Sequence, residues 1–438
     1  MRYSDLIQQT LLGNTAIRWN YYSHSFNLNT LSPQHSSKFI TEYFEYGEKE
    51  LPLLVNPNDA RHFISHYFAH GQKGRALSFD RSEEQQLPDD RAIHTVSTFF
   101  LGLFIENCIN GQRTLFIEGS TDFPFVYLWF LTALYHDYGY CVSEKKGGLV
   151  HVTQDSFLPA IGFGRRNGNL GHRERDAINR MRRDLGINLS PIERISFRSP
   201  ADENRINIEK AMLQEIARRA KNKNRRLHFN NGTVLPSCQY EPETIVRYYN
   251  YRNNVWKAAD HGIVGGFLFF DRMLKNYLVS YFAKLQEETT PCDPNDFIFR
   301  GRHFCSDQLS VFHYISDCIM AHNIWKQPEN MRQKYEEYQL TELFQEHFKP
   351  ISYQDNPILF ILAVTDTLEP LKVYIEIESE IVINALNIEY LPGSNSLFLS
   401  SASYDVPISR LYQKAKELET WTTVKCDLSP EGILAIQL

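Results

Sequence analysis

Long apolar runs broken by single polar residues dominate the middle of this chain. Five of them have helical length and mostly apolar composition, which predicts buried helices. They are residues 91–108, 121–140, 240–283, 305–327 and 357–370. A strand is favoured only for a short stretch such as 113–119, "RTLFIEG". The pattern therefore predicts a mainly α-helical core.

The pattern changes after Pro370. "IVINALNIEYL", "SLFLSSA", "TVKCDLS" and "GILAIQL" are typical of strands, and "SRLYQKAKELETW" is typical of a helix. We therefore expect three parts: an N-terminal accessory region at 1–90, a helical domain at 91–370, and a small α+β unit at 371–438.

Composition places the chain among ordinary globular proteins. Of its 438 residues 42% are hydrophobic and 22% are charged, and the net charge of −6 argues against a general polyanion binder. The seven cysteines form no CxxC pair, which suits a reducing cytosol and gives no zinc-finger signature. We found no signal peptide, and no apolar run near the ~18–20 residues that span a bilayer. A cytoplasmic protein without a membrane partner is expected.

Residues 165–226 form a strongly basic segment. They contain 17 basic and 8 acidic residues, so this segment carries +9 and the remainder of the chain about −15. We expect it to belong to an insertion at about 145–240 within the helical domain. A solvated basic face is one interpretation, and a cradle for phosphate groups or nucleic acid is the other.

Potential metal ligands occur singly among the apolar neighbours of the predicted helices. They are His94, His136, Asp137, His261, His322 and Asp366. Each alone is most simply a core residue with a hydrogen-bond partner, but several on separate helices favour a shared centre in a helical bundle. A second group, His62, His66 and His70, has i, i+4 spacing without an acidic residue. Packing is the simpler interpretation there.

The order of these ligands resembles the HD-domain superfamily of metal-dependent phosphohydrolases. "LTALYHDYGY" is similar to that family's HD motif at a helix end, "DHGIVGG" to the later His-Gly segment of members with two metals, and "AVTDTLEP" to the terminal Asp motif. The resemblance covers roughly 91–370 and implies an HD-type helical bundle. More than 120 residues separate Asp137 from His261, which departs from the compact spacing of the family.

The resemblance implies a ligand for each position. His94, His136, Asp137 and Asp366 would bind a first divalent metal, and Asp137 would bridge to a second one held by His261 and His322. His313 competes with His322, but the two are nine residues apart and lie on opposite sides of a helix, and we prefer His322. The catalytic residues would be Asp137 and His136. Mn, Mg, Fe, Zn and Ni are not distinguishable as the metal.

The expected function is hydrolysis of a phosphate ester, most simply that of a nucleotide, by a metal-activated water. Basic residues would hold the substrate phosphates, and the candidates are Arg91, Lys145, Lys146, Arg182 and Arg183. Alternatives are an HD-type di-iron oxygenase, a non-catalytic nucleotide-binding regulatory protein, and a nuclease. Nucleic acid is not favoured as a partner, and a homo-oligomer is left open.

Overall fold

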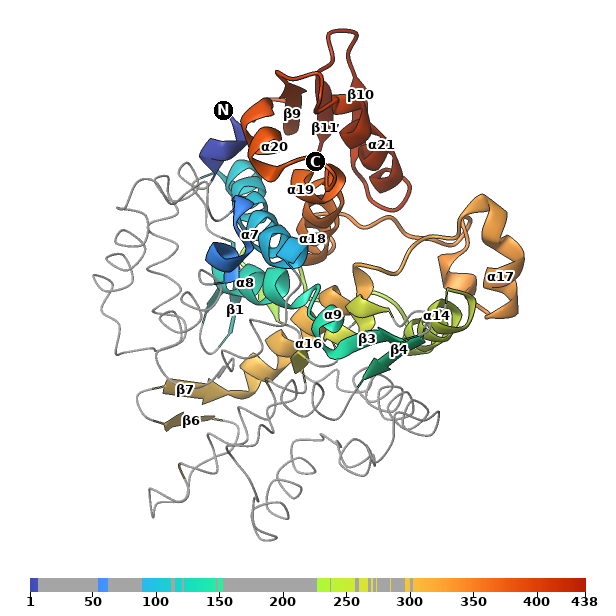
Figure 1. The fold of residues 1–438 in the computed structure, drawn as a ribbon. Helices are drawn as coiled ribbons and strands as arrows, with labels where there is room; N and C mark the ends of the chain where they lie inside the picture. Colours follow the sequence, from blue (N-terminus) through green and yellow to red (C-terminus); the bar gives the residue numbers. More distant parts are fainter. Residues whose placement is uncertain are drawn as a thin grey trace.

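The computed structural model is mainly helical in the part of the chain that it describes (Figure 1). The described residues are 1–6, 54–61, 89–111, 115–119, 122–146, 149–152, 227–236, 238–256, 260–266, 269–270, 273, 284, 296–299 and 302–438. Most of the expected accessory region, the whole basic segment and the three spaced histidines at 62, 66 and 70 lie outside these ranges.

Four helices build the core around the site. They are α7 (Asp89–Asn110), α8 (Phe125–Tyr135), α16 (Ser306–Ala321) and α18 (Pro357–Leu368). All eleven side chains of α8 are buried, because α7, α16 and α18 all pack against it. The indole Nε1 of Trp129 donates a 2.8 Å hydrogen bond to the carbonyl of Phe99, and Gly102 gives that ring its space: a Cβ there would lie 2.1 Å from Trp129 Cζ2.

The helix α7 is, by length and composition, able to cross a membrane over Arg91–Asn110, a 20-residue span. The sequence pattern had led us to expect no such run. However, 78% of its apolar window is buried inside the protein, and α8 and α18 pack against it. These contacts are those of a buried core helix.

The HD pair lies at the C-terminal end of α8. The backbone N–H of His136 still donates to the Thr132 carbonyl at 3.0 Å, after which the chain turns. Gly139 then begins the single-turn helix α9 (Gly139–Val142). The chain then enters the hairpin of β3 (Ser143–Lys146) and β4 (Leu149–Val152).

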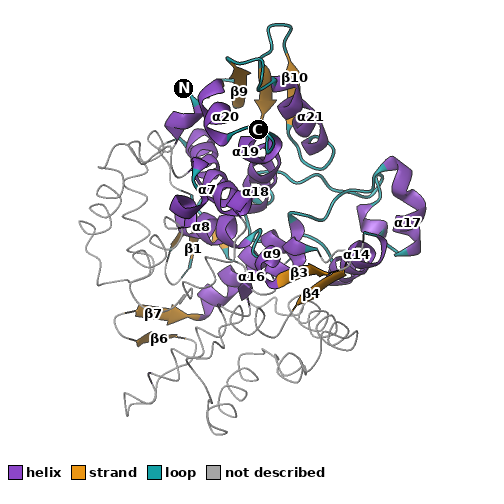
Figure 2. Ribbon diagram, viewed as in Figure 1, coloured by secondary structure: helices purple, strands orange, loops and turns teal. Residues whose placement is uncertain are grey.

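Shorter elements complete the part of the structure that precedes Pro370 (Figure 2). A three-stranded antiparallel sheet has the order β2 (Phe123–Pro124), β1 (Phe116–Glu118), β5 (His228–Phe229), and β6 (Asp296–Phe299) pairs with β7 (Arg302–Cys305). The remaining helices are α14 (Pro242–Val255), α17 (Arg332–Glu337) and the 3-10 turns Glu329–Met331 and Thr341–Leu343.

The segment from Pro370 to the end is an α+β arrangement. Its helices are α19 (Pro370–Val373), α20 (Ser379–Ala385) and α21 (Ile408–Leu418). Its four-stranded antiparallel sheet has the order β10 (Lys425–Leu428), β11 (Leu434–Gln437), β9 (Ser396–Ser401), β8 (Leu386–Leu391). The strand expected over "IVINALNIEYL" is wrong in its first half, where α20 buries Val382 and Ile383 and exposes Ile381. So short an apolar run has no decisive period.

Residues 1–6 connect the helical core to the segment that begins at Pro370. The 3-10 helix η1 (Tyr3–Asp5) packs against α20 and β8, and the N–H of Ile388 donates to the Met1 carbonyl at 2.8 Å. Tyr3 and Leu6 are buried. This short segment is therefore part of the packed structure.

Candidate metal centre

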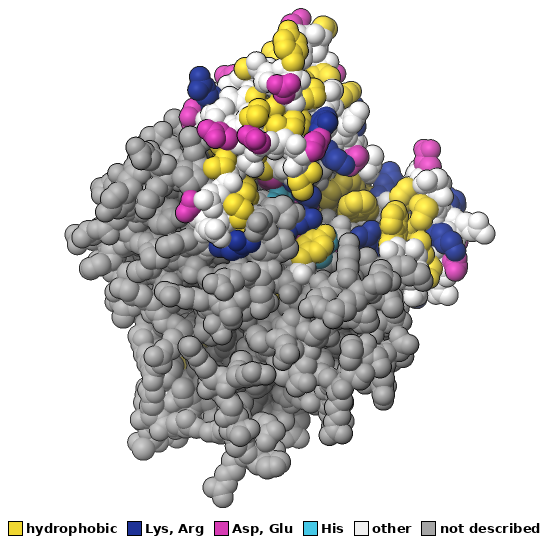
Figure 3. Space-filling view, viewed as in Figure 1, with side chains coloured by type: hydrophobic (Ala, Val, Ile, Leu, Met, Phe, Trp, Pro, Cys, Tyr) yellow, Lys and Arg dark blue, Asp and Glu magenta, His cyan; other side chains and the backbone are white. Residues whose placement is uncertain are grey.

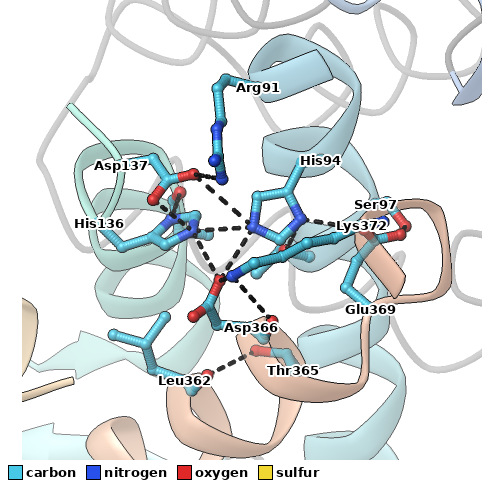
Figure 4. Close-up of polar contacts among 12 residues, drawn as sticks. Arg91, His94, Ser97, His136, Asp137, Leu362, Thr365, Asp366, Glu369 and Lys372 are labelled. Atoms are coloured by element: carbon cyan, nitrogen blue, oxygen red, sulfur yellow. Dashed lines mark hydrogen bonds and ion pairs between the residues drawn. The ribbon is translucent and has the colours of Figure 1, made fainter. Parts of the chain in front are cut away.

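Six polar side chains from five different segments converge where α7, α8, α16 and α18 meet. His94 comes from α7, Asp366 from the last turn of α18, and His136 and Asp137 from the turn after α8 (Figure 4). The others are His261, in the helical stretch 260–266, and His322, the C-terminal cap of α16. All six sequence-predicted ligands thus lie in one place.

The first group consists of His94, His136 and Asp366. Asp366 Oδ1 lies 3.0 Å from His94 Nε2 and 3.6 Å from His136 Nε2, and the two imidazole nitrogens are 3.2 Å apart. The three candidate donor atoms all lie within 4.8 Å of one another. A group this close could hold one metal ion.

The second group consists of Asp137, His261 and His322, again with donor atoms within 4.8 Å of one another. Asp137 Oδ1 lies 3.3 Å from His261 Nε2. Asp137 also faces the first group, with its oxygens 3.8 Å from His94 Nε2 and 3.7 Å from His136 Nε2. Its carboxylate is therefore placed between the two groups and could serve both.

Hydrogen bonds fix which ring nitrogen of the histidines faces the centre. His136 Nδ1 donates to the Ala133 carbonyl at 2.6 Å, and His322 Nδ1 donates to the Ile319 carbonyl at 2.6 Å. A carbonyl oxygen only accepts, so each Nδ1 carries a proton and each Nε2 is the nitrogen that faces the centre. A metal ligand needs that tautomer.

Two buried atoms of the second group have no hydrogen-bond partner among the described residues: Asp137 Oδ1 and His322 Nε2. Both side chains are almost fully buried, with 1% and 2% of their surface exposed. Leaving such atoms unsatisfied costs free energy. Both are electron-pair donors, so a cation bound between them would remove that cost.

The electrostatics keep these donors in the forms that bind cations. Burial would raise the pKa of Asp137, but His136, His261 and His94 outweigh it and lower that pKa below the usual range. Burial lowers the pKa of His261 and brings that of His322 to about 4, so both rings are neutral at pH 7. The ionised carboxylate and the neutral rings are thus ready to coordinate.

His94 differs from the other histidines of the centre. Burial would lower its pKa, but its hydrogen bonds to Asp366 and Glu369 raise it to about 9. An ion that binds at Nε2 must therefore displace a proton.

Glycines in "DHGIVGG" let the helical stretch 260–266 approach the centre. A Cβ on Gly262 would lie 2.8 Å from His322 Cε1, and one on Gly265 would lie 2.9 Å from the Tyr135 carbonyl. Gly139 has the same function on the other side, since its Cβ would lie 2.2 Å from the His261 carbonyl. The Gly-rich sequence is thus explained by close packing beside two ligands.

Two cations border the centre. Arg91 Nη1 donates to Asp137 Oδ2 at 3.1 Å, and Lys372 Nζ donates to Asp366 Oδ1 at 2.6 Å (Figure 4). Arg91 also lies over the ring of Tyr140, which stacks on His261 with the centroids 4.2 Å apart. Figure 3 shows a small area of histidine reaching the surface beside Lys and Arg atoms.

The other predicted site residues have different positions. Lys145 and Lys146 belong to β3, of which only the backbone is described, and Arg182 and Arg183 lie outside the described residues. His313 packs against the ring of Phe270 with the centroids 6.0 Å apart and belongs to neither donor group, whereas His322 belongs to the second.

Sequence reasoning missed Glu369 and Lys372. Glu369 accepts a 2.9 Å hydrogen bond from His94 Nδ1, and it caps α19 by accepting from the N–H groups of Leu371 and Lys372. The Glu-Pro pair was a signal for a helix start, because proline is favoured at the first helical position. Nothing in the local sequence indicated that the same carboxylate reaches α7.

Comparison with known proteins adds no relative. No protein-family model matches the chain, and neither a curated protein nor a solved structure matches it significantly. What can be inferred about function rests on the geometry of the centre itself.

Proposed function

We propose that this protein is a metal-dependent phosphohydrolase of HD type that cleaves a phosphate ester, most simply that of a nucleotide. The observation that carries this proposal is the convergence of six side chains into two donor groups, with the Asp137 carboxylate close to both. They are, in chain order, His94, His136, Asp137, His261, His322 and Asp366.

The donors fit divalent ions. Imidazole and carboxylate together suit Mn, Fe, Zn and Ni, whereas Mg prefers oxygen donors alone. His94, His136 and Asp366 would hold a first ion, His261 and His322 a second, and Asp137 would contact both. Two such ions supply Lewis acidity and a water of lowered pKa for attack on a phosphoryl group.

The chain's own residues would favour an anionic substrate. Arg91 and Lys372 bring two positive charges to the edge of the centre, and their side chains are 23% and 37% exposed. Positive charge at the mouth of a site raises the local concentration of an anion. The exposed part of each side chain is where phosphate oxygens would be held.

The runner-up is an HD-type di-iron oxygenase, favoured by the same mixture of four imidazoles and two carboxylates, since it also suits iron. A non-catalytic nucleotide-binding role is disfavoured, because a degenerate scaffold would lose ligands first. A cytoplasmic location is part of the proposal. It is consistent with the free thiols of Cys108, Cys318 and Cys426.

The test is metal content together with a hydrolysis screen. Protein purified without added metal is analysed for bound ions and for the spectrum of a mixed-valent di-iron centre, and is then assayed on nucleotides, cyclic nucleotides and model phosphodiesters. We expect a divalent metal and hydrolysis of one substrate class. A mixed-valent iron spectrum with no hydrolysis would instead establish the oxygenase alternative.

A matched pair of variants on α16 connects activity to the centre. His322→Gln should lose bound metal and hydrolysis, whereas His313→Gln, nine residues earlier on the same helix, should keep both. Equal metal content and equal turnover in the two variants would contradict the proposal.

A further inference from the structure

A buried chain of hydrogen bonds runs from residues 1–6 to the first donor group. Tyr3 OH lies 2.8 Å from Ser97 Oγ, and Ser97 Oγ donates to Glu369 Oε1 at 2.6 Å. Glu369 Oε2 in turn accepts from His94 Nδ1 at 2.9 Å. At most 2% of the surface of each of these four residues is exposed, so solvent does not compete for their hydrogen bonds.

The direction of each bond follows from the number of protons. The Ser97 hydroxyl has one proton, which it gives to the Glu369 carboxylate, so Tyr3 must donate to the Ser97 oxygen. Glu369 then accepts four hydrogen bonds, from Ser97, from His94 and from the N–H groups of Leu371 and Lys372. Four donors satisfy a buried carboxylate and hold it in one orientation.

Capping of α19 does not account for a glutamate here. Short side chains such as Asp, Asn, Ser and Thr are the preferred helix caps. The additional methylene of Glu369 lets one carboxylate accept from two N–H groups of α19 and also reach two side chains of α7, Ser97 and His94, which are one helical turn apart. The length of this side chain is used to orient the imidazole.

We propose that Glu369, Ser97 and Tyr3 are positioning residues that orient His94 for metal binding, so that the docking of residues 1–6 sets the affinity of the first ion. A carboxylate that accepts from the outer nitrogen of a metal-bound histidine fixes the ring and increases its basicity. Tyr3 adds a connection to the C-terminal sheet, because residues 1–5 pack against α20 and β8. This inference rests on the proposed function.

The effect of each residue should decrease with its distance from the ring. Glu369→Gln should weaken binding of the first ion about 10- to 100-fold, as is usual for the outer partner of a metal-binding histidine. Tyr3→Phe and Ser97→Ala should each weaken it roughly 2- to 10-fold, the change expected from one hydrogen bond of ordinary net strength. Since Tyr3 acts only through Ser97, the double variant should lose little more than Ser97→Ala alone.

The experiment is titration of the full-length protein with Co²⁺, followed by the visible spectrum of the bound ion and by thermal denaturation. The matched control is Tyr314→Phe, which also removes one buried hydroxyl, here from a 2.6 Å hydrogen bond to Asn356. Asn356 lies ten residues before Asp366 on α18, about 15 Å along the helix. We expect both tyrosine variants to lose thermal stability. Only Tyr3→Phe should weaken the binding of the first Co²⁺ ion and change the visible spectrum of that ion.

Two other results have separate meanings. Equal Co²⁺ affinity and an unchanged spectrum in wild type, Tyr3→Phe and Ser97→Ala would overturn this inference and leave the proposed function in place. A wild-type protein that binds no Co²⁺ would overturn both.

Discussion

Replacing Asp137 by asparagine tests the centre without a change of side-chain shape. The Asp137 carboxylate lies within 3.3 to 3.8 Å of His94, His136 and His261, so it is close to both donor groups. An amide of the same size has one oxygen and no charge, and its NH₂ group cannot bind a cation. Asp137→Asn should therefore weaken the binding of both ions at once.

The expected size of the effect follows from mass action. An ion at one hundred times its dissociation constant adds about 2.7 kcal/mol to the free energy of unfolding, so two ions add about 5 kcal/mol. An unfolding entropy of roughly 2.1 cal/mol/K per residue amounts to about 0.9 kcal/mol/K for 438 residues. Saturation with metal should then raise the melting temperature of the wild type by about 6 °C, and that of Asp137→Asn by close to zero.

The assay is thermal denaturation with and without a saturating divalent ion. The control is Asp317→Asn, which changes another buried aspartate, one that accepts a 2.7 Å hydrogen bond from the N–H of Gln239. This control should lower the melting temperature in the absence of metal and retain the metal-dependent rise. A rise of the same size in Asp137→Asn as in the wild type would refute a bridging role for this carboxylate.

Two further predictions concern single features of the centre, and a third concerns the basic segment. Gly262→Ala should remove one of two bound ions, measured as metal stoichiometry, because its Cβ would lie 2.8 Å from His322 Cε1. Burial would lower the pKa of His94, but its two carboxylate partners raise it to about 9. Ion binding below that pH must therefore release a proton, and the affinity for the ion should fall as the pH falls. Calorimetry in buffers of different ionisation enthalpy measures the number of protons released. Charge reversal at Arg182 and Arg183 should raise KM more than it lowers kcat if the basic segment attracts the substrate, and unchanged kinetics would contradict this.

The candidate ligands could be selected from the sequence because each is a polar residue in an apolar setting. His94 lies among the buried residues of α7, and His136 and Asp137 follow the wholly buried α8. Burial without a partner is costly, so such positions are predicted to have a function or a specific contact. Helix geometry allowed only one of His313 and His322 to face the centre, and the apolar context "CIMAHNIW" favoured His322. Of these two, the structure places His322 beside the centre.

The residues that support the ligands could not be identified in this way. Glu369 is next to a proline at a helix start, and Lys372 follows in the first turn of that helix, where the sequence gives no sign of a special contact. Their contacts with His94 and Asp366 depend on how α18, α19 and α7 are placed in space. Local patterns contain no information on that placement, which the packing of the whole core determines.

The centre and the fold depend on each other through charge. Packing four imidazoles and two carboxylates together in an apolar interior is unfavourable unless each polar atom has a partner. The outer atoms have theirs: backbone carbonyls hold His136 and His322, Glu369 holds His94, and Arg91 and Lys372 hold the carboxylates. The inner atoms, Asp137 Oδ1 and His322 Nε2 among them, face one another. Because the protein supplies partners for the outer atoms, a cation between the inner ones would give the unsatisfied inner atoms a partner as well.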